Sequence, residues 1–508
     1  MNLPLEARLD LQAKIAGYAV DCRMLFMGDR IRQLVRTYEE IIHRFKKFQG
    51  DAKRLYDSLQ RSEEIKQFYK IEFSDGVTSV QLHPSIFAEK GTLEDLDLDV
   101  QFQLGKKKFI APLPFDRIQA LGHLVPLLRL NRKEAEIRNS CESNLRAEEA
   151  EWALSLFASL KEKGFLTTAN LPENFFMQTP PRPRVTFMGH SSLLFQSTSA
   201  SVLADPLLRL KLRLPVFGMD VARLKLNAIC ISHTHWDHCD LQTLIWFDKN
   251  TLILIPEVKQ PTVFNPPLVE TLRLLGFKNI REAKLWEPIQ IEDIEVVPVP
   301  FHGEQDEPGA VIDHFTYVLR TEGLTVYGGV DSYRDTFGDM KPVLERIRDQ
   351  YQPDLAFLPV SKMVYRYEWG GVNAFCRYFD TTMVDKDFQY TASGEDAAEW
   401  VRVLKPQWAA PYATFNFPRW STPAQVTDFE SALSQVGLQD RLYPFRPFDV
   451  LESTDFQPGS SRELKRRAMV RWFKFGARMS RNHHRLMANR IYRFISWRIK
   501  ERIDIEHH

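Results

Sequence analysis

Long apolar runs and paired cysteines are both missing from this sequence of 508 residues. No stretch of about 18 apolar residues occurs, so no membrane-spanning helix is predicted. The first residues, Met1 to Arg8, lack the apolar core of a secretory signal peptide. The five cysteines are odd in number and scattered, without a Cys-x-x-Cys pair, which favours a reducing compartment over a disulfide framework. We therefore expect a cytoplasmic protein.

A large net charge is also lacking, since the formal net charge is only +1, but the charge is unevenly distributed. From Ser461 to His508, fourteen Lys or Arg accompany four acidic residues, so this segment carries about +10 and the remainder about −9. Aromatic residues such as Trp472 and Trp497 interleave with the cations, as in an interfacial amphipathic helix. We predict a basic helical tail at 451–508 that binds an anionic membrane surface, as a peripheral protein does, or an acidic protein. A helix pair docked on the protein's own acidic surface is the alternative, and nucleic acid is the partner we expect least.

One short run is dense in metal-binding side chains. Five residues within eight positions can donate an imidazole nitrogen or a carboxylate oxygen: His233, His235, Asp237, His238 and Asp240. They follow an apolar, partly β-branched stretch that predicts a short buried strand at 226–231. The first two histidines are two positions apart, so in an extended backbone they point the same way and can share one ion. The next Asp and His can turn toward a second ion about 3.5–4 Å away, and this donor set suits zinc, iron or manganese.

The pattern His-x-His-x-Asp-His after an apolar strand resembles the signature of the metallo-β-lactamase superfamily. Val185–Phe195 with Val202–Pro206 is similar to the entry hairpin of its phospholipase D- and lactonase-type branch, and Tyr327–Ser332 resembles the strand that ends in a metal-bridging Asp. The resemblance covers about residues 181–450. It implies an α/β fold, an αββα sandwich with one or two metal ions at the edge between its sheets. It further implies that Asp331 bridges the ions and that His190 lies close to them, where we assign His190 and Asp237 as catalytic residues.

Two residues compete for the third place on the first ion. With His302 there, three imidazoles hold the metal, as in the zinc hydrolases of the superfamily; with Glu304 the site is richer in carboxylate. The spacing does not choose between them, because Gly303 lets the backbone turn. The segment Phe301–Glu304 resembles the diiron oxygenase branch, which includes the β-hydroxylase of the chloramphenicol pathway. That branch has a similar N-terminal extension and a helix start like Ser393–Ala398. Carboxylate-rich sites suit iron that changes oxidation state, whereas histidine-rich ones suit zinc.

A late histidine, which many superfamily members supply to the second ion, is absent. Its nearest equivalent is the segment Ala409–Phe415, and no histidine occurs between His314 and His483. The second ion is then weakly held, held by a substitute such as Tyr412 or Asp240, or missing.

The residues before the metal-binding run predict two further regions. Residues 1–75 are rich in helical periodicity, and 76–180 mix strand-like and helical patterns, ending in Ala158–Leu166, which resembles a winged-helix module. A linker with four prolines at 170–184 leads into the catalytic domain at 181–450. The tail at 451–508 completes the predicted order of domains.

These observations predict a metal-dependent enzyme with two metal ions, iron favoured and zinc the alternative. Our first hypothesis is an O2-dependent dinuclear-iron oxygenase or hydroxylase of a biosynthetic, natural-product pathway. His233, His235 and Glu304 would hold one iron, Asp237 and His238 the other, on a small-molecule, carrier-tethered or peptide-like substrate. The rival is a zinc hydrolase of a phosphodiester, amide or lactone, in which metal-bound hydroxide attacks. A non-catalytic metal-binding scaffold is the third possibility, and a homo-oligomer is compatible with each.

Overall fold

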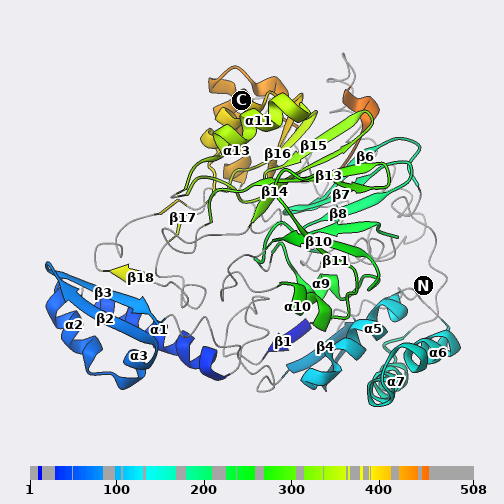
Figure 1. Ribbon diagram of the computed structural model, residues 1–508, viewed down its shortest axis with the longest axis horizontal. Helices are drawn as coiled ribbons and strands as arrows, with labels where there is room; N and C mark the ends of the chain where they lie inside the picture. Colours follow the sequence, from blue (N-terminus) through cyan, green and yellow to red (C-terminus); the bar gives the residue numbers. More distant parts are fainter. Residues whose placement is uncertain are drawn as a thin grey trace, which may run out of the picture.

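Two β-sheets face each other at the centre of the computed structural model, and helices cover their outer faces (Figure 1). The α/β class and the αββα sandwich predicted from the sequence are thereby confirmed. The structure describes residues 10–13, 29–48, 50–83, 98–104, 107–129, 133–166, 179–208, 225–235, 237–257, 268–304, 314–335, 337–361, 364–365, 378–380, 388–389, 391–413, 423–443 and 449–456. The predicted basic tail beyond 456 lies outside these residues.

The first sheet has seven strands in the order β11-β10-β9-β8-β7-β6-β21. Strands β8 to β11 run parallel to one another. Parallel strands are covered on both faces and are therefore apolar along their length, which confirms the buried strand expected before His233. The bounds are Arg184–Gly189 (β6), Ser192–Gln196 (β7), Ser201–Ala204 (β8), Ala228–Cys230 (β9), Leu252–Pro256 (β10), Ile280–Ala283 (β11) and Val450–Glu452 (β21).

The second sheet has six strands in the order β12-β13-β14-β15-β16-β20. Strands β12 to β15 form an antiparallel meander, and β15, β16 and β20 are parallel. The bounds are Ile289–Ile291 (β12), Ile294–Pro300 (β13), Phe315–Thr321 (β14), Leu324–Gly328 (β15), Leu355–Pro359 (β16) and Trp408–Tyr412 (β20).

A continuous apolar cluster fills the space between the sheets, for example Phe187 and Phe195 from the first and Phe357 and Tyr412 from the second. Outside the second sheet lie α11 (Met340–Tyr351), α12 (Gly394–Leu404) and α13 (Pro423–Gln435), which pack into a further cluster with β13 and β16. Helix α12 begins where the sequence predicts, because Ser393 and Asp396 cap it reciprocally. Smaller elements are α9 (Leu241–Leu244), α10 (Leu268–Leu274), β17 (Val364–Tyr365), β19 (Phe388–Gln389), and the 3-10 turns η2 (Phe115–Arg117), η5 (Gln439–Arg441) and η6 (Ser453–Phe456).

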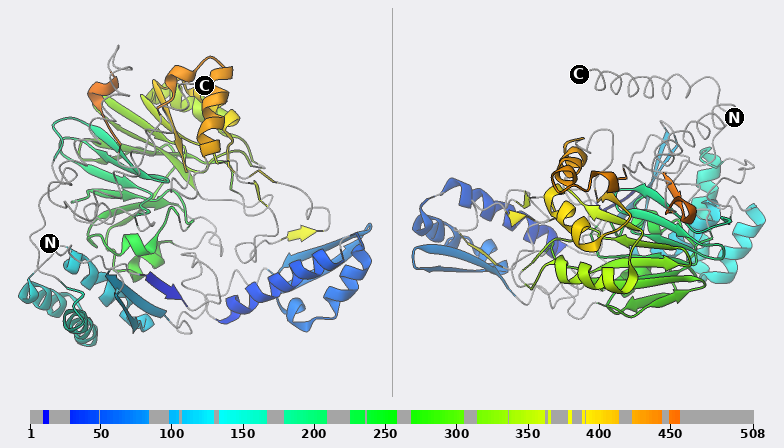
Figure 2. Two further views of the ribbon diagram at one scale, coloured as in Figure 1. Left: turned by 180° about the vertical axis from the view of Figure 1, so that it is seen from behind. Right: turned by 90° about the horizontal axis from the view of Figure 1, so that it is seen from above.

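The N-terminal residues form a separate group of elements at one end of the molecule (Figure 2). Helices α1 (Asp29–Lys47), α2 (Ala52–Gln60) and α3 (Glu63–Phe68) follow the predicted helical pattern, and the hairpin β2 (Tyr69–Ser74) and β3 (Val77–Leu82) follows them. Strand β18 (Tyr378–Asp380), from far along the chain, pairs antiparallel with β3. A segment inserted between β16 and α12 of the sandwich thus completes the N-terminal sheet.

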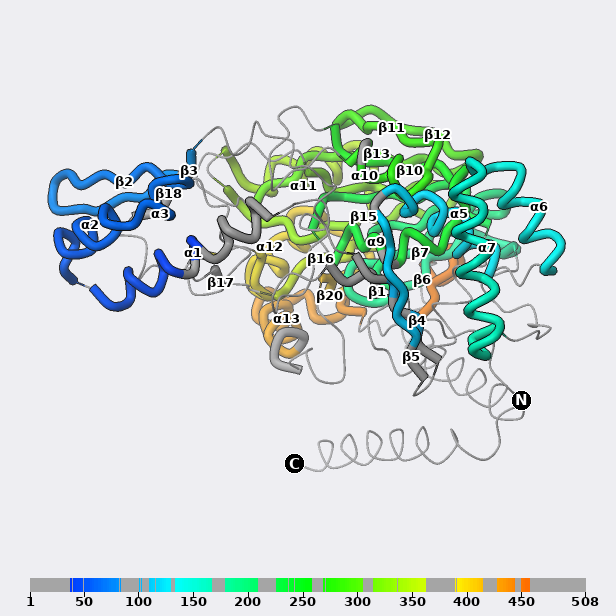
Figure 3. Tube along the Cα trace, turned by 90° about the horizontal axis from the view of Figure 1, so that it is seen from below, coloured from blue at the N-terminus to red at the C-terminus, as the bar shows by residue number. Residues whose placement is uncertain are grey.

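A second group of N-terminal elements packs on the first sheet, at the opposite end of the molecule from α2 and α3 (Figure 3). It contains α5 (Ile118–Arg129), α6 (Glu134–Asn144) and α7 (Ala147–Glu162), as the sequence predicts, and a sheet of β1 (Asp10–Ala13), β4 (Leu98–Leu104) and β5 (Lys107–Pro112). Residues 10–13 were expected to be helical but form a strand, because they pair with β4 far along the chain. Leu121, Leu156 and Phe165 belong to one apolar cluster with Leu203 and Ile229 of the first sheet. These helices therefore cover an outer face of the sandwich. The winged-helix resemblance and the domain boundaries stay predictions.

Gly122 is the closest contact between α5 and the sandwich. A Cβ at this position would lie 2.2 Å from the carbonyl oxygen of Leu275, a backbone atom that cannot rotate away. We expect Gly122→Ala to lower the free energy of unfolding by about 1–3 kcal/mol, although alanine favours a helix by about 1 kcal/mol. Denaturant titration would measure the change. The control is Glu151→Ala, an exposed position on the neighbouring helix α7, which should be nearly neutral. An unchanged or raised midpoint for Gly122→Ala would contradict this contact.

None of the helices in the described part of the chain has the length and apolar character needed to cross a bilayer.

Candidate metal centre

The polar side chains singled out in the sequence meet at one edge of the sandwich, where several strands end. The run from Ser232 to Asp240 follows β9, Phe301–Glu304 follows β13, and Asp331 follows β15. The turn between β6 and β7 and the end of β8 reach the same edge, bringing His190 and Asp205. Because both sheets end here, residues from five distant parts of the chain lie within contact of one another.

His233, His235 and Glu304 form the first of three donor clusters. The Glu304 Oε2 atom lies 3.2 Å from His233 Nε2 and 2.9 Å from His235 Nδ1. His233 is fully buried, and its Nδ1 atom is 2.9 Å from the hydroxyl of Ser232, which leaves Nε2 turned toward the carboxylate. The three side chains converge on one point, as a shared ion requires.

A sharp turn at Gly303 separates Glu304 from His302. Gly303 has φ +111° and Glu304 φ +46°, both in the left-handed region, and a Cβ on Gly303 would lie 2.7 Å from the Tyr333 nitrogen. The imidazole of His302 instead contacts the carboxylate of Asp335, 3.1 Å from Nδ1 to Oδ2. Among the described residues His302 belongs to no donor cluster, so the structure brings Glu304, not His302, to the two histidines.

The other two clusters share His238 and contain His190, Asp237, His233 and Asp331. His238 Nε2 lies 3.1 Å from Asp331 Oδ2, and His190 Nε2 lies 3.0 Å from Asp237 Oδ2. The rings of His233 and His238 are 4.1 Å apart between centroids, so the clusters are contiguous. Two ions at neighbouring positions, with Asp331 between them, would match this arrangement.

Asp205 is the residue that sequence reasoning missed. Its carboxylate is fully buried and accepts hydrogen bonds from the Ser232 backbone nitrogen (2.7 Å), the Ser232 hydroxyl (2.7 Å) and His238 Nδ1 (3.0 Å). Such a carboxylate fixes the orientation of the imidazole and leaves Nε2 for an ion. The signal in the sequence was Ala204-Asp205-Pro206 at the end of an apolar strand, which we used only to recognise the hairpin.

Burial and charge oppose each other in this cluster. Burial alone would lower the pKa of His238, but the carboxylates of Asp331, Asp237 and Asp205 raise this pKa well above the ordinary value. Burial would likewise raise the pKa of Asp237, yet the imidazoles of His238, His190 and His235 hold it below the usual range. Without an ion, a proton on His238 neutralises part of the negative charge, and an ion bound there would take the place of that proton.

The donor set fits a pair of transition-metal ions. The ligand atoms within each cluster lie within 4.8 Å of one another, and the cluster residues are buried apart from His235, whose side chain is 12% exposed. Asp331 Oδ1 is buried and accepts no hydrogen bond from the part of the chain that the structure describes, although a carboxylate oxygen in such a place needs a partner. The four imidazoles and three carboxylates suit iron, zinc or manganese and exclude a thiolate site.

The two substitutes considered for the missing late histidine are otherwise engaged. Asp240 accepts a hydrogen bond from Thr243 at 2.7 Å where α9 begins, and it is in none of the described donor clusters. The Tyr412 hydroxyl donates to the carbonyl of Ser191 and lies 2.5 Å from the Tyr317 hydroxyl. Burial, followed by the charge of Asp205, raises the pKa of Tyr412 well above the ordinary value, which keeps the phenol protonated. Neither side chain is arranged as an anionic ligand of the second ion.

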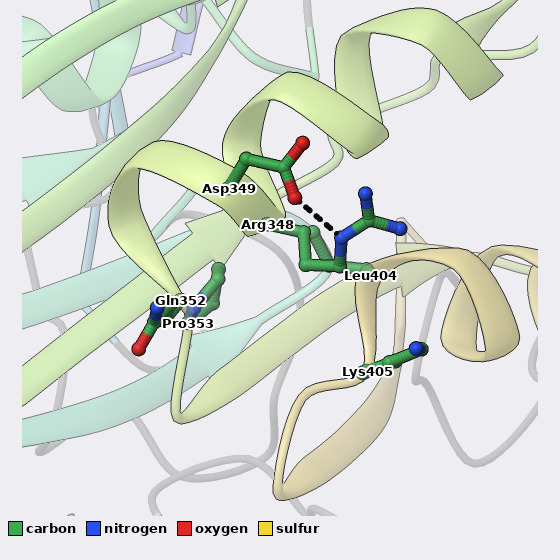
Figure 4. A pocket seen from close by; sticks show the side chains of 6 residues that line it. All are labelled: Arg348, Asp349, Gln352, Pro353, Leu404 and Lys405. Carbon is green, nitrogen blue, oxygen red and sulfur yellow. Dashed lines mark hydrogen bonds and ion pairs between the residues drawn. The ribbon is translucent and has the colours of Figure 1, made fainter.

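A hollow of about 440 Å³ lies elsewhere, between the ends of α11 and α12. Figure 4 shows Arg348 and Asp349 paired beside it, with Lys405 on the opposite wall. It is at the edge where β16 and β20 begin, whereas the metal centre is at the edge where strands of this sheet end. The hollow is therefore no part of the candidate centre.

Known proteins are similar to this chain over one domain, and one of them over a short stretch. Residues 184–413 match the family described as the beta-lactamase superfamily domain. A UPF0173 metal-dependent hydrolase from Methanopyrus kandleri is 22% identical over 274 residues, which span 53% of this chain and 99% of the relative. An 84-residue stretch, 16% of each protein, is 30% identical to a 3-hydroxylase of Streptomyces venezuelae named for 4-amino-L-phenylalanyl on the CmlP peptidyl carrier protein.

Among solved structures, CmlA, a diiron β-hydroxylase from Streptomyces venezuelae, has a TM-score of 0.58 and 15% identity. The match covers 89% of this chain and 99% of CmlA, so the shared fold extends well beyond residues 184–413. The chain therefore carries a beta-lactamase superfamily domain in residues 184–413, and its fold and donor clusters are those of a metal-dependent enzyme.

Proposed function

We propose that the protein is an O2-dependent dinuclear-iron hydroxylase of a biosynthetic pathway whose substrate is tethered to a carrier. The observation that carries the proposal is the direction of Glu304, whose carboxylate reaches His233 and His235 while His302 turns to Asp335. A carboxylate in this place makes the first site richer in oxygen donors. Such sites suit iron that changes oxidation state better than zinc that acts as a Lewis acid.

The extent of the likeness to CmlA supports the same proposal. The UPF0173 relatives span 50–53% of this chain, whereas the fold of the diiron hydroxylase covers 89% of it. Outside the matched domain at 184–413 lie α5 to α7, which pack on the first sheet, and the group of α1 to α3. A hydrolase domain alone does not need these elements, while an enzyme that receives a substrate on a partner protein can use them for docking.

The chain's own residues would bind the two ions and orient the side chains that bind them. His233, His235 and Glu304 would hold one ion, and Asp237 and His238 the other, with Asp331 between them; bound iron would supply the activation of O2. Asp205 fixes the orientation of His238, and the Gly303 turn aims Glu304. His302, 22% exposed beside Asp335, lies next to the centre and is placed to contact substrate.

A zinc-dependent hydrolase is the second candidate, since the relatives of 22–24% identity are named metal-dependent hydrolases. It would use the same donor clusters to generate hydroxide for attack on a phosphodiester, amide or lactone. Glu304, rather than a third imidazole, completes the first donor cluster of the described residues, and this argues against the hydrolase.

Metal analysis together with an optical spectrum separates the two functions. Purified protein, loaded anaerobically with ferrous iron and reduced, is expected to hold about two irons, to develop visible absorption in air and to consume O2. The same apoprotein loaded with zinc serves as the control and should stay colourless. Zinc bound in preference to iron, no O2 uptake, and turnover of a nitrophenyl phosphodiester or a lactone by the zinc form would establish the hydrolase instead.

A further inference from the structure

We propose that His190 is a ligand of the second metal ion and takes the place that a late histidine holds elsewhere in the superfamily. The inference rests on the two-ion centre of the proposed function, and it holds whether the reaction is oxygenation or hydrolysis. It adds a residue from the first hairpin of the domain to a centre otherwise built from Asp237, His238 and Asp331.

The position of the imidazole is that of a ligand. His190 Nε2 is 3.0 Å from Asp237 Oδ2, and together with His238 these residues form one of the three described donor clusters. The ring of His190 is edge-on to that of His238, with centroids 5.2 Å apart, so both imidazoles border the same space. His190 is only 1% exposed. Its nitrogen therefore faces a buried carboxylate, not solvent.

The backbone around His190 is fixed by the segment that lacks the late histidine. His190 adopts φ +50°, a left-handed conformation that a non-glycine residue takes up at a cost of roughly 1–3 kcal/mol. Its carbonyl accepts a hydrogen bond from the Ala413 nitrogen at 3.1 Å, and the next carbonyl, that of Ser191, accepts one from the Tyr412 hydroxyl. Two consecutive carbonyls are thus held by the end of β20. The segment in which many members of the superfamily have the late histidine thus positions His190, from the turn between β6 and β7, in this chain.

The competing role for His190 is to hydrogen-bond to the carboxylate of Asp237 without binding the ion. In that case its N–H would only donate to Asp237, and the ion would be bound without it. An amide side chain can replace such a donor but is a poor ligand for a transition metal. Glutamine at position 190 therefore distinguishes the two roles, whereas alanine removes both.

The decisive measurement is the number of metal ions retained after dialysis by the whole protein. Wild type should hold two equivalents, and both His190→Ala and His190→Gln should hold one. The affinity for the second ion should fall by more than the roughly 10–100-fold that is typical when a residue that only hydrogen-bonds to a metal ligand is removed. The ion kept by His233, His235 and Glu304 reports that the variants are folded. His123→Ala is the matched control, because His123 is on α5 and bonds to Ser140; it should hold two.

Two results would overturn the assignment: two equivalents retained by His190→Gln, or a single equivalent in wild type. Neither depends on catalysis. If the protein binds two zinc ions and hydrolyses an ester, the proposed hydroxylase fails, while the count in the His190 variants still decides the role of His190.

Discussion

Glu304→Ala is expected to empty the first metal site and abolish activity, while its neighbour His302→Ala keeps the metal. Glu304 Oε2 contacts both His233 and His235 and is 4% exposed, so alanine leaves two imidazoles facing each other without their carboxylate. Losing one of three protein ligands should lower the affinity for the first ion by more than about 100-fold. This exceeds the loss of about 10–100-fold that is typical when a residue that only hydrogen-bonds to a metal ligand is removed. Metal content after dialysis against a weak chelator measures the effect.

His302→Ala is the matched control, because it removes a donor of the same segment two positions away. The imidazole of this residue contacts Asp335 and packs over Gly338, where a Cβ would lie 2.9 Å from the ring. We expect this variant to keep both ions and to lose activity, as a residue that contacts substrate would. The reverse pattern, an empty first site in His302→Ala and a filled one in Glu304→Ala, would reject the donor set that supports the hydroxylase.

The sandwich was predicted because short motifs of the sequence resemble those of the metallo-β-lactamase superfamily. The apolar run before His233, the hairpin at 185–206 and the Ser393 cap each depend on neighbouring residues, and each prediction is confirmed. The two-residue spacing of His233 and His235 likewise predicted that their side chains share one cluster, as they do in the structure. Motifs of this kind, whose residues are neighbours in the sequence, can be recognised without knowledge of the tertiary contacts.

Side-chain directions at the centre could not be predicted in the same way. Whether His302 or Glu304 faces the histidines depends on the close approach of Gly303 to Tyr333, thirty residues later in the chain. Asp205 became recognisable only when β8 and β9 were adjacent, because its partners Ser232 and His238 are supplied by the next strand. The pairing of β18 with β3 joins segments about three hundred residues apart, which no local pattern encodes. The membrane or acidic partner of the tail stays a prediction.

Substitution of Asp205 is expected to lower the free energy of unfolding strongly. Its two oxygens accept three hydrogen bonds, from the Ser232 nitrogen and hydroxyl and from His238 Nδ1, and all of these groups are buried. Asp205→Ala leaves three donors without their acceptor and removes a carboxylate beside an imidazole whose pKa is raised by it. Breaking a buried pair from one side costs about 3–5 kcal/mol. We expect a loss of that order in the free energy of unfolding of the metal-free protein, measured by denaturant titration.

Asp205→Asn separates the stabilising role of this residue from its role in orienting His238. Asparagine keeps the size and one carbonyl oxygen, which can still accept from the Ser232 nitrogen, so the metal-free protein should lose less stability than with alanine. The charge that holds His238 Nδ1 is gone, and the amide can present N–H groups to an imidazole that needs an acceptor. The affinity for the ion on His238 should therefore fall about 10–100-fold in this variant, while the site of Glu304 stays filled. A variant with full affinity at both sites would show that the charge of Asp205 is not needed to orient His238.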